Sequence, residues 1–529
     1  MVSEIIKTLL IVDSSTFLIS LAVFLVCIYV SRQLFWTRNG AQSAMKLPPS
    51  GPRTWPVIGC MPSLIGDEPQ KLFAKMSAEF GPVFYTRIGV VPTLILNDFP
   101  SMREAFSRSG DDFADRPKLG MMEYITKGRG IISAHVGENQ RERRRFGLAA
   151  LRSLGMGKSR LIENIVSEIE TLSDLFTSRK SQPFVPFHDV NVSVSNIISW
   201  IVFGQRFKHD DIYFKQFLDI IHEGLEISET TGVTGFIPVL QYLPLPVWRK
   251  LANNHRKWQE FDSAMIKDAL NRPESEEPCF VQMYMEELKR MQEEEACNGN
   301  LPRDGSDSSI GPSTGGVPFS EDDLRQTLGD LFVAGTDTTA TTLMWAILYL
   351  VLHPDIQRKV HEELDKAIGR DRMPTLEQRK DIPYTEAVLM EVQRMATIVP
   401  LAVPHASTCD TKLFNFDIPA GTLVLPNLWA VHYDPKTWKN PEEFVPERFL
   451  NEDRTAVVQR DELIPFCIGR RKCLGEQLAK MELYFFFTHL LHRFEFRLPE
   501  GSPRPSTVGK VGATRIPMPY QVCAIPRNP

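Results

Sequence analysis

The sequence predicts a mainly α-helical fold with small β-sheets, preceded by one N-terminal transmembrane helix. Three observations lead to this class. An apolar stretch occupies residues 11–30, helical patterns fill most of residues 141–290, and the strand-like pieces elsewhere are short. The chain has 529 residues, of which 43% are apolar and 24% charged, so its composition is that of a large globular protein rather than a disordered one.

The N-terminal apolar stretch approaches the roughly 20 residues that a membrane-spanning helix needs. Three basic residues, Arg32, Arg38 and Lys46, follow it and place the long C-terminal part in the cytosol. The alternative is a cleaved signal peptide. No small-x-small cleavage site follows Val30, and the cysteines are not arranged as in a secreted protein. We therefore expect residues 1–31 to form a membrane anchor.

Residues 32–56 predict a basic, proline-rich hinge, because four prolines within residues 48–56 exclude a helix. The folded body follows over residues 57–529. Near its start, two short strand-like runs at 83–88 and 93–96 predict a hairpin.

Further along the body, residues 296–318 are rich in glycine, serine and proline and predict a flexible surface linker between helices. Ser320 and the acidic residues after it form a helix N-cap, and a long helix follows to about residue 352, where Pro354 ends it. Other helices are expected at about 384–395 and 473–493, strand-like pieces at 412–416 and 422–425, and irregular structure at 435–449.

The cysteines and the charge exclude several classes of protein. Eight cysteines are scattered without a CxxC pair, which argues against a disulfide scaffold and against a zinc ribbon. The net charge is -5 and no long basic tract occurs, so nucleic acid is not an expected partner.

The strongest motif is residues 466–475, Phe-Cys-Ile-Gly-Arg-Arg-Lys-Cys-Leu-Gly. A glycine, three cations and Cys473 stand directly before a predicted helix. A helix N-terminus presents free N–H groups and a positive end, and both favour a thiolate over a thiol. Cys473 is therefore a candidate metal ligand, and the cations can pair with carboxylates of a bound cofactor. The alternative for a single cysteine before a helix is a buried structural residue.

These ten residues resemble the haem-binding loop of the cytochrome P450 superfamily. The resemblance implies a haem b cofactor, iron protoporphyrin IX, with Cys473 as its axial thiolate and Arg471 on a haem propionate. Cys467 competes for the ligand role, but it lacks the following glycine and the helix start, and the family usually has glycine there. We interpret Cys467 as a packing residue.

A second motif, residues 334–339, reads Ala-Gly-Thr-Asp-Thr-Thr and lies within the long apolar helix. Glycine, hydroxyl and acidic residues are poor choices for a helix interior, which suggests a function. The alternative is a polar helix face whose threonines bond back to carbonyls. The motif resembles the family's oxygen-activation site. By that resemblance Asp337 and Thr338 are an acid–alcohol pair for proton delivery, and Gly335 lets the helix open around dioxygen.

Other positions resemble the microsomal, animal family-two type of the superfamily. Arg116 in Phe-Ala-Asp-Arg-Pro, His405 after a proline, and Arg144 in the basic run 137–146 are implied to hold haem propionates. Gln140 stands where the family has tryptophan. One indole donor is therefore lost, although an amide can also donate a hydrogen bond.

A third motif begins with Glu391 and Arg394, which share a helix face at a spacing that usually means only a surface ion pair. Together with Arg448 in Pro-Glu-Arg-Phe they resemble the Glu-Arg-Arg triad of the same family, and the resemblance implies a structural role.

The resemblance covers residues 47–526 and implies a monooxygenase that inserts one oxygen atom from O2 into a lipophilic substrate, such as a fatty acid, steroid or xenobiotic. Electrons would come from NADPH through NADPH–cytochrome P450 reductase, with cytochrome b5 as a further partner. Residues 57–529 would form the haem-thiolate catalytic domain, held at the cytosolic side of the endoplasmic reticulum membrane by the single-pass anchor. The candidate docking face for the reductase contains Arg141, Arg143 and Arg145.

The expected substrate pocket is apolar. By analogy its lining comes from Met121, Met122, Ile125, Phe332, Ala334, Val399, Leu401, Val403 and the turn at 511–513. The segment 236–248 interleaves apolar residues with prolines and either dips into the bilayer or forms a buried loop. Two alternative functions stay open. A haem-thiolate isomerase or dehydratase commonly lacks the acid–alcohol pair, and a non-enzymatic haem-binding sensor needs no proton path.

Overall fold

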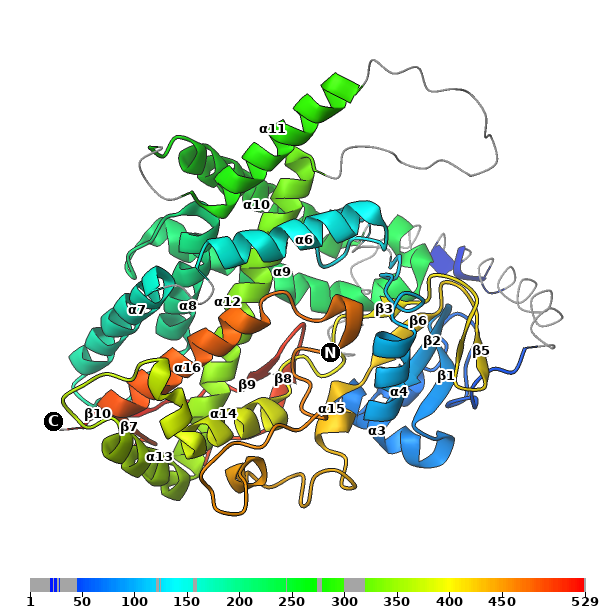
Figure 1. Ribbon diagram of the computed structural model, residues 1–529. Helices are drawn as coiled ribbons and strands as arrows, with labels where there is room; N and C mark the ends of the chain where they lie inside the picture. The colour runs from blue at the N-terminus through cyan, green and yellow to red at the C-terminus, as the bar shows by residue number, and fades with distance from the viewer. Residues whose placement is uncertain are drawn as a thin grey trace.

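The computed structural model describes residues 45–529, with gaps at 120–122, 124, 156–158, 244, 274–277, 299–318 and 528–529, and a few positions between 20 and 28. The described chain is mainly helical, as predicted (Figure 1). Its α-helices are α3 (Pro69–Phe80), α4 (Phe99–Arg103), α6 (Glu138–Ser153), α7 (Ser159–Ser178), α8 (Phe187–Phe203), α9 (Ile212–Phe236), α10 (Pro246–Leu270), α11 (Phe280–Asn298), α12 (Glu321–Leu352), α13 (Pro354–Ala367), α14 (Pro383–Ala396), α15 (Leu428–His432) and α16 (Glu476–Arg493).

The strands of the described chain form one four-stranded sheet and three two-stranded sheets. They are β1 (Val83–Ile88), β2 (Val91–Leu96), β3 (His405–Ala406), β4 (Thr411–Leu413), β5 (Phe416–Ile418), β6 (Leu423–Pro426), β7 (Phe494–Arg497), β8 (Gly509–Val511), β9 (Arg515–Pro517) and β10 (Cys523–Pro526). The larger sheet has the order β1-β2-β6-β3, in which only β2 and β6 are parallel. The predicted first hairpin is confirmed as β1 and β2. The single strand expected at 412–416 is wrong, because Phe414 adopts a φ of 54° and the chain turns there between β4 and β5.

Helix α12 passes through the centre of the molecule, where α8 and α16 pack against it (Figure 1). It begins at the predicted N-cap, since the Ser320 hydroxyl accepts a hydrogen bond from the Asp323 N–H at 3.0 Å. Residues 340–351 are all buried. The helix continues unbroken through Gly335, where a Cβ would lie 3.2 Å from Ile198 of α8. This glycine therefore also allows α8 and α12 to approach each other closely.

Of the helices in the described part of the chain, α12 alone is long and apolar enough to cross a membrane. Within its most apolar stretch 78% of the residues are buried inside the protein, so α12 is a core helix. The predicted anchor at residues 1–31 lies almost entirely outside the described residues, and so do the first part of the hinge and most of the linker at 296–318.

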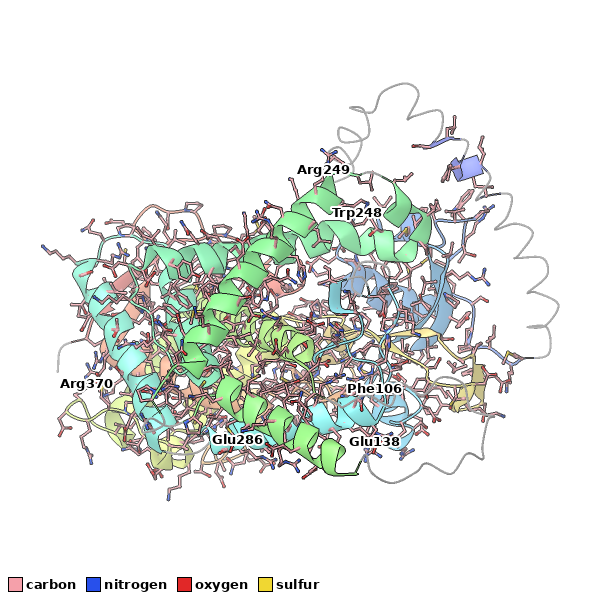
Figure 2. All side chains as sticks on the ribbon, turned by 90° about the horizontal axis from the view of Figure 1, so that it is seen from above. Phe106, Glu138, Trp248, Arg249, Glu286 and Arg370 are labelled. Atoms are coloured by element: carbon pink, nitrogen blue, oxygen red, sulfur yellow. The ribbon has the colours of Figure 1, made fainter. Side chains whose placement is uncertain are left out.

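The segment after α9 packs against the edge of the larger sheet. The Val90 N–H in the β1–β2 turn donates to the Phe236 carbonyl at 3.0 Å. Gly89 in the same turn has a φ of 59°, and a Cβ there would lie 2.0 Å from that carbonyl oxygen. Trp248, which Figure 2 labels at the start of α10, is half-buried and donates its indole N–H to the Leu243 carbonyl at 2.8 Å. Phe236 and Trp248 are both half-buried, and the residues between them whose burial the structure describes are half-buried or exposed.

Candidate active site

The motif around Cys473 forms a tight loop between a short 3-10 helix, η6 (Gly469–Arg471), and α16. The Cys473 N–H donates to the Phe466 carbonyl at 3.0 Å. Gly469 has a φ of 82°, and a Cβ there would lie 1.9 Å from the Phe106 carbonyl oxygen, so this position requires glycine. The loop is thereby fixed against the segment around Phe106, which Figure 2 labels.

Cys473 lies three residues before α16, and its side chain is accessible from outside the loop. Neighbouring protein still crowds the sulfur, and this burial raises the pKa of the thiol. A hydrogen bond from the backbone of Gly475 and the charges of Arg144 and Lys472 act in the opposite direction. The helix start alone therefore does not hold a thiolate here, and coordination to a metal cation would supply the remaining stabilisation.

Cys467, the competing cysteine, is half-buried and packs against the apolar cluster that contains Phe106 and Phe113. Its φ is 56°, in the left-handed region that favours glycine, which is the residue expected there by the resemblance. Burial raises the pKa of its thiol. All three observations support the interpretation of Cys467 as a packing residue.

Two predicted haem-binding arginines, Arg116 and Arg471, are buried, and among the described residues their hydrogen bonds go to backbone carbonyls. The partners of Arg116 are Ile132 at 2.8 Å, Val403 at 3.0 Å and Pro404 at 2.8 Å. Those of Arg471 are Ala114 at 2.8 Å, Ile131 at 3.3 Å and Ala134 at 2.5 Å. These bonds fix both guanidinium groups in place without neutralising their charge.

Neither Arg116 nor Arg471 forms an ion pair within the described chain, although the charge of Asp115 attracts both. Burial lowers the pKa of Arg116 to about 9, and repulsion from Arg471 adds to the effect. Burial likewise lowers the pKa of Arg471 to about 10, together with repulsion from Arg144. The nearest carboxylate, Asp115, is engaged by His135 at 3.3 Å. Because buried cations without an anion are costly, the cluster fits a cofactor that carries carboxylates.

His405 lies in the same cluster on β3. Its Nδ1 is 2.8 Å from the Phe113 carbonyl, so Nδ1 donates and Nε2 is left for another partner. Burial lowers the pKa of His405 to about 3, and the charge of Arg116 contributes to this shift. A carboxylate brought close to this ring would favour the protonated form.

Helix α6 contributes Arg144, the fourth residue predicted to contact a haem propionate. Arg144 donates to the Lys472 carbonyl and thereby joins α6 to the loop of Cys473. One turn earlier, Gln140 is 5% exposed, and its Nε2 amide has no hydrogen-bond partner within the described chain. An unpaired buried donor one helical turn from Arg144 is consistent with an acceptor on a bound group.

The basic run of α6 is not one exposed face. Arg143 is buried and forms an ion pair with Asp323 at the start of α12. The expectation that Arg143 belongs to a docking face with Arg141 and Arg145 is therefore wrong for Arg143. Its partner lies far away in the sequence, so the charge run gave no sign of the pairing. Arg141 and Arg145 are exposed, as expected.

The acid and the alcohol of the second motif point in different directions. The Thr338 hydroxyl donates to the Ala334 carbonyl at 2.7 Å. This is the bond to the preceding helical turn that the alternative interpretation of the motif expects. Ala334 is nevertheless exposed in the middle of α12, and Thr338 lines a cavity of about 40 Å³ together with Phe466 of the Cys473 loop. The structure thus brings Thr338, but not Asp337, to the side of the cysteine loop.

Asp337 is 1% exposed and turns toward the C-terminal hairpin, where the Thr514 hydroxyl donates to its Oδ2 at 2.5 Å. Burial raises the pKa of Asp337, while Thr514 and the charge of His222 oppose the shift. Neither Thr514 nor His222 could be identified from the sequence as a neighbour of Asp337. Each is a single residue, in a hairpin and on α9 respectively, and neither belongs to a recognisable motif.

Several predicted pocket residues can now be placed. The prediction that Phe332 lines the pocket is wrong. Phe332 is buried in the core, and its ring centroid lies 5.3 Å from those of Phe203 and Phe217. Ala334 borders the open side of α12, and Val403 is exposed. Val399, Leu401 and Ile125 are half-buried, while Met121 and Met122 lie outside the described residues.

The predicted triad is assembled. Glu391 and Arg394 are fully buried on α14, and the Glu391 carboxylate accepts from Arg394 at 2.7 and 2.8 Å. The same carboxylate accepts from Arg448 Nε at 3.0 Å. The three side chains join α14 to the irregular segment that precedes the Cys473 loop.

Comparison with known proteins gives consistent matches over nearly the whole chain. The family model described as Cytochrome P450 matches residues 49–524. Cytochrome P450 2U1 of Homo sapiens is 38% identical over 517 residues, which cover 92% of this chain and 91% of that protein. Cytochrome P450 2J2 of Homo sapiens is 37% identical over 484 residues, covering 90% and 91%. Cytochrome P450 2D14 of Bos taurus is 36% identical over 485 residues, covering 90% and 93%.

Proposed function

This chain belongs to the cytochrome P450 family, and from that premise we propose that the Cys473 thiolate would bind the iron of its haem. The chain is a haem-dependent monooxygenase, and its cofactor is iron protoporphyrin IX. The single observation that carries the proposal is that Cys473 shares one tight loop with Arg471, a buried arginine that forms no ion pair among the described residues.

In this proposal the cationic cluster holds the haem propionates. Arg116, Arg144 and Arg471 would form charge-assisted hydrogen bonds to the carboxylates, and His405 would join them in its protonated form. Backbone carbonyls already orient Arg116 and Arg471, so neither guanidinium group needs to reorganise when the cofactor binds.

The bound haem supplies the activation of dioxygen and the transfer of one oxygen atom to the substrate, and thiolate ligation favours O–O cleavage. The chain itself supplies protons. In this proposal Thr338 holds a proton at its hydroxyl beside the cysteine loop, and Asp337, whose side chain turns toward Thr514, is the acid that supplies it. The raised pKa of Asp337 suits this role, since a carboxyl that stays protonated closer to neutral pH is an effective general acid.

A Thr338→Ala variant tests the proton-delivery role. We expect it to retain the thiolate-type carbon monoxide difference spectrum, because the cysteine loop is untouched. With reductase and NADPH, product formed per NADPH consumed should fall by roughly 10²-fold, and hydrogen peroxide should account for the difference. A Thr338→Ser variant, which keeps the hydroxyl, serves as the control. Unchanged coupling in Thr338→Ala would contradict the assignment.

Gln140 is proposed to donate its unpaired amide to a propionate in place of the tryptophan of related chains. Gln140→Leu keeps a similar volume but removes the donor, so haem transfer to an excess of apomyoglobin should accelerate by roughly tenfold. Glu138→Gln, an exposed change on the same helix, should leave the transfer rate unchanged. If Gln140→Leu releases haem as slowly as the natural protein, the amide does not hold the cofactor.

The reductase is proposed to dock on the basic surface that surrounds the cysteine loop. This surface contains Arg141 and Arg145 of α6, Arg470 and Lys472 of the loop, and Lys480 of α16. Four of these five cations are paired with the carboxylates of Asp111, Glu142 and Glu476, so a positive excess of two charges remains. Opposite charge steers association more than it adds affinity, so the rate of reduction should depend on salt. Cytochrome b5 would compete for the same surface.

We further propose that residues 1–31 anchor the catalytic domain, residues 57–529, to the endoplasmic reticulum membrane on its cytosolic side, through the hinge at 32–56. The substrate is a lipophilic molecule, in keeping with the family. A type I spectral-shift screen over fatty acids, steroids and xenobiotics, followed by product identification with reductase and NADPH, would define it. The isomerase, dehydratase and sensor alternatives predict no product that depends on the reductase.

A further inference from the structure

A second, larger cavity of about 340 Å³ lies beside Asp337. It is enclosed by α9, α12 and the β8–β9 hairpin, and it shares no lining residue with the cavity beside Thr338. Its polar lining includes His222, Thr514, Lys510 and Glu226. Thr514 both lines this cavity and donates to Asp337, so its hydroxyl connects the cavity to the carboxyl group.

Solvent can reach this cavity. Lys510 of β8 and Glu226 of α9 form an ion pair at 3.4 Å, and their side chains are 58% and 68% exposed. Both residues line the cavity, so it extends to the protein surface where this pair joins the hairpin to α9. A cavity of this size with several polar groups readily holds ordered water.

The hairpin holds Thr514 in a fixed position. Arg515, the next residue, donates its N–H to the Ile398 carbonyl at 2.7 Å. Its own carbonyl accepts from the indole of Trp345 on α12 at 2.8 Å. These two bonds fix the backbone directly after Thr514, and Thr514 itself is 7% exposed. Such anchoring keeps the hydroxyl directed at Asp337.

The described groups around Asp337 leave its second carboxylate oxygen without a hydrogen bond. Its Oδ1 is buried and has no hydrogen-bond partner within the described chain. His222 interacts with Asp337 electrostatically and lines the cavity. The His222 Nε2 accepts from Asn191 Nδ2 at 3.1 Å, because Asn191 Oδ1 already accepts from Ser195 at 3.1 Å. A neutral His222 therefore carries its proton on Nδ1.

We propose that Asp337 takes up its protons from water in this cavity through the Thr514 hydroxyl. The inference rests on the proposed role of Asp337 as a proton donor. Thr514 passes its hydroxyl proton to Asp337 Oδ2 and receives one from hydronium in the cavity, so one proton moves, one water returns to solvent, and no electrons are transferred. Thr514 is a positioning residue, since it acts through Asp337.

The test compares Thr514→Ala with Thr514→Ser, because both remove the methyl group and only serine keeps the hydroxyl. Each variant is assayed as holoenzyme with reductase and NADPH, on dodecanoic acid, testosterone and 7-ethoxycoumarin as probes. The measurements are product formed per NADPH consumed and the solvent deuterium isotope effect on product formation. Asp337→Asn is assayed in parallel, and Thr507→Val, an exposed threonine in the segment before β8, is the control.

We expect Thr514→Ala to lower coupling by roughly tenfold and to enlarge the solvent isotope effect, while Thr514→Ser and Thr507→Val behave as the natural protein. The carbon monoxide difference spectrum should be unchanged in all of them. If Asp337→Asn uncouples the enzyme but Thr514→Ala and Thr514→Ser behave alike, uptake through Thr514 is overturned and the role of Asp337 stands. If Asp337→Asn stays fully coupled, the proton-donor role itself fails.

Discussion

A Cys473→Ser variant is expected to lose the thiolate-type carbon monoxide difference spectrum and all detectable monooxygenase activity. Serine keeps the backbone of the loop, including the 3.0 Å hydrogen bond from residue 473 to the Phe466 carbonyl. Its hydroxyl is not ionised near neutral pH, however, and cannot provide the electron density by which a thiolate favours O–O cleavage. The measurements are the difference spectrum of the purified protein and reductase-dependent product formation.

The competing cysteine provides the control for this experiment. Cys467→Gly removes the other sulfur and relieves a backbone φ of 56°, so it should keep both the spectrum and the activity. The opposite pattern, with the spectrum lost in Cys467→Gly and kept in Cys473→Ser, would reverse the ligand assignment. Haem content measured separately distinguishes a changed ligand from a lost cofactor.

The cysteine loop could be predicted from the sequence because its signals are local. Gly469, the cations and Cys473 all lie within ten residues, and the tight turn that they imply is present. The N-cap of α12 is local in the same way, because Ser320 bonds to the N–H of Asp323 three residues later.

The features that could not be predicted depend on contacts between distant segments. Helical periodicity places Arg143 on a face of α6, but it does not reveal that Asp323 of α12 covers that face. In the same way, the motif identifies Asp337 but not its direction, which is set by Thr514, 177 residues away. Phe332 was assigned to the pocket by analogy, whereas its neighbours on α8 and α9 make it part of the core.

The second large effect is expected at Glu391, where a Glu391→Gln variant should lower the free energy of unfolding by about 3–5 kcal/mol. Among the described residues, the Glu391 carboxylate is the one anion that pairs with the guanidinium groups of Arg394 and Arg448, from which it accepts at 2.7 Å and 3.0 Å respectively. Glu391 and Arg394 are fully buried, so water cannot replace the lost charge. Two adjacent cations would then repel each other in a poorly screened environment.

The loss of the Glu391 charge should also affect the cysteine loop, through the hydrogen bonds of His432. Arg394 donates to the His432 carbonyl at 2.8 Å, and the His432 Nε2 accepts from the Ile464 N–H at 3.0 Å. Burial lowers the pKa of His432 to about 3, so the ring is neutral and Nε2 is available as an acceptor. The Ile464 carbonyl in turn accepts from the Cys467 N–H at 3.0 Å, inside the loop. Loss of the Glu391 charge therefore loosens the scaffold that positions Cys473.

Two measurements test this chain of contacts in the holoprotein. The urea midpoint should fall strongly in Glu391→Gln, and the surviving folded protein should release haem faster than the natural protein. Glu260→Gln is the matched control, because Glu260 pairs with Arg256 at 2.5 Å on α10, with both side chains more than half exposed. Exposed pairs of this kind contribute little, so its midpoint should not move. An equal response of the two variants would mean that the buried triad does not stabilise the fold. If Glu391→Gln loses much stability but retains haem as well as the natural protein, the proposed link through His432 is contradicted. The loop would then be held independently of α14.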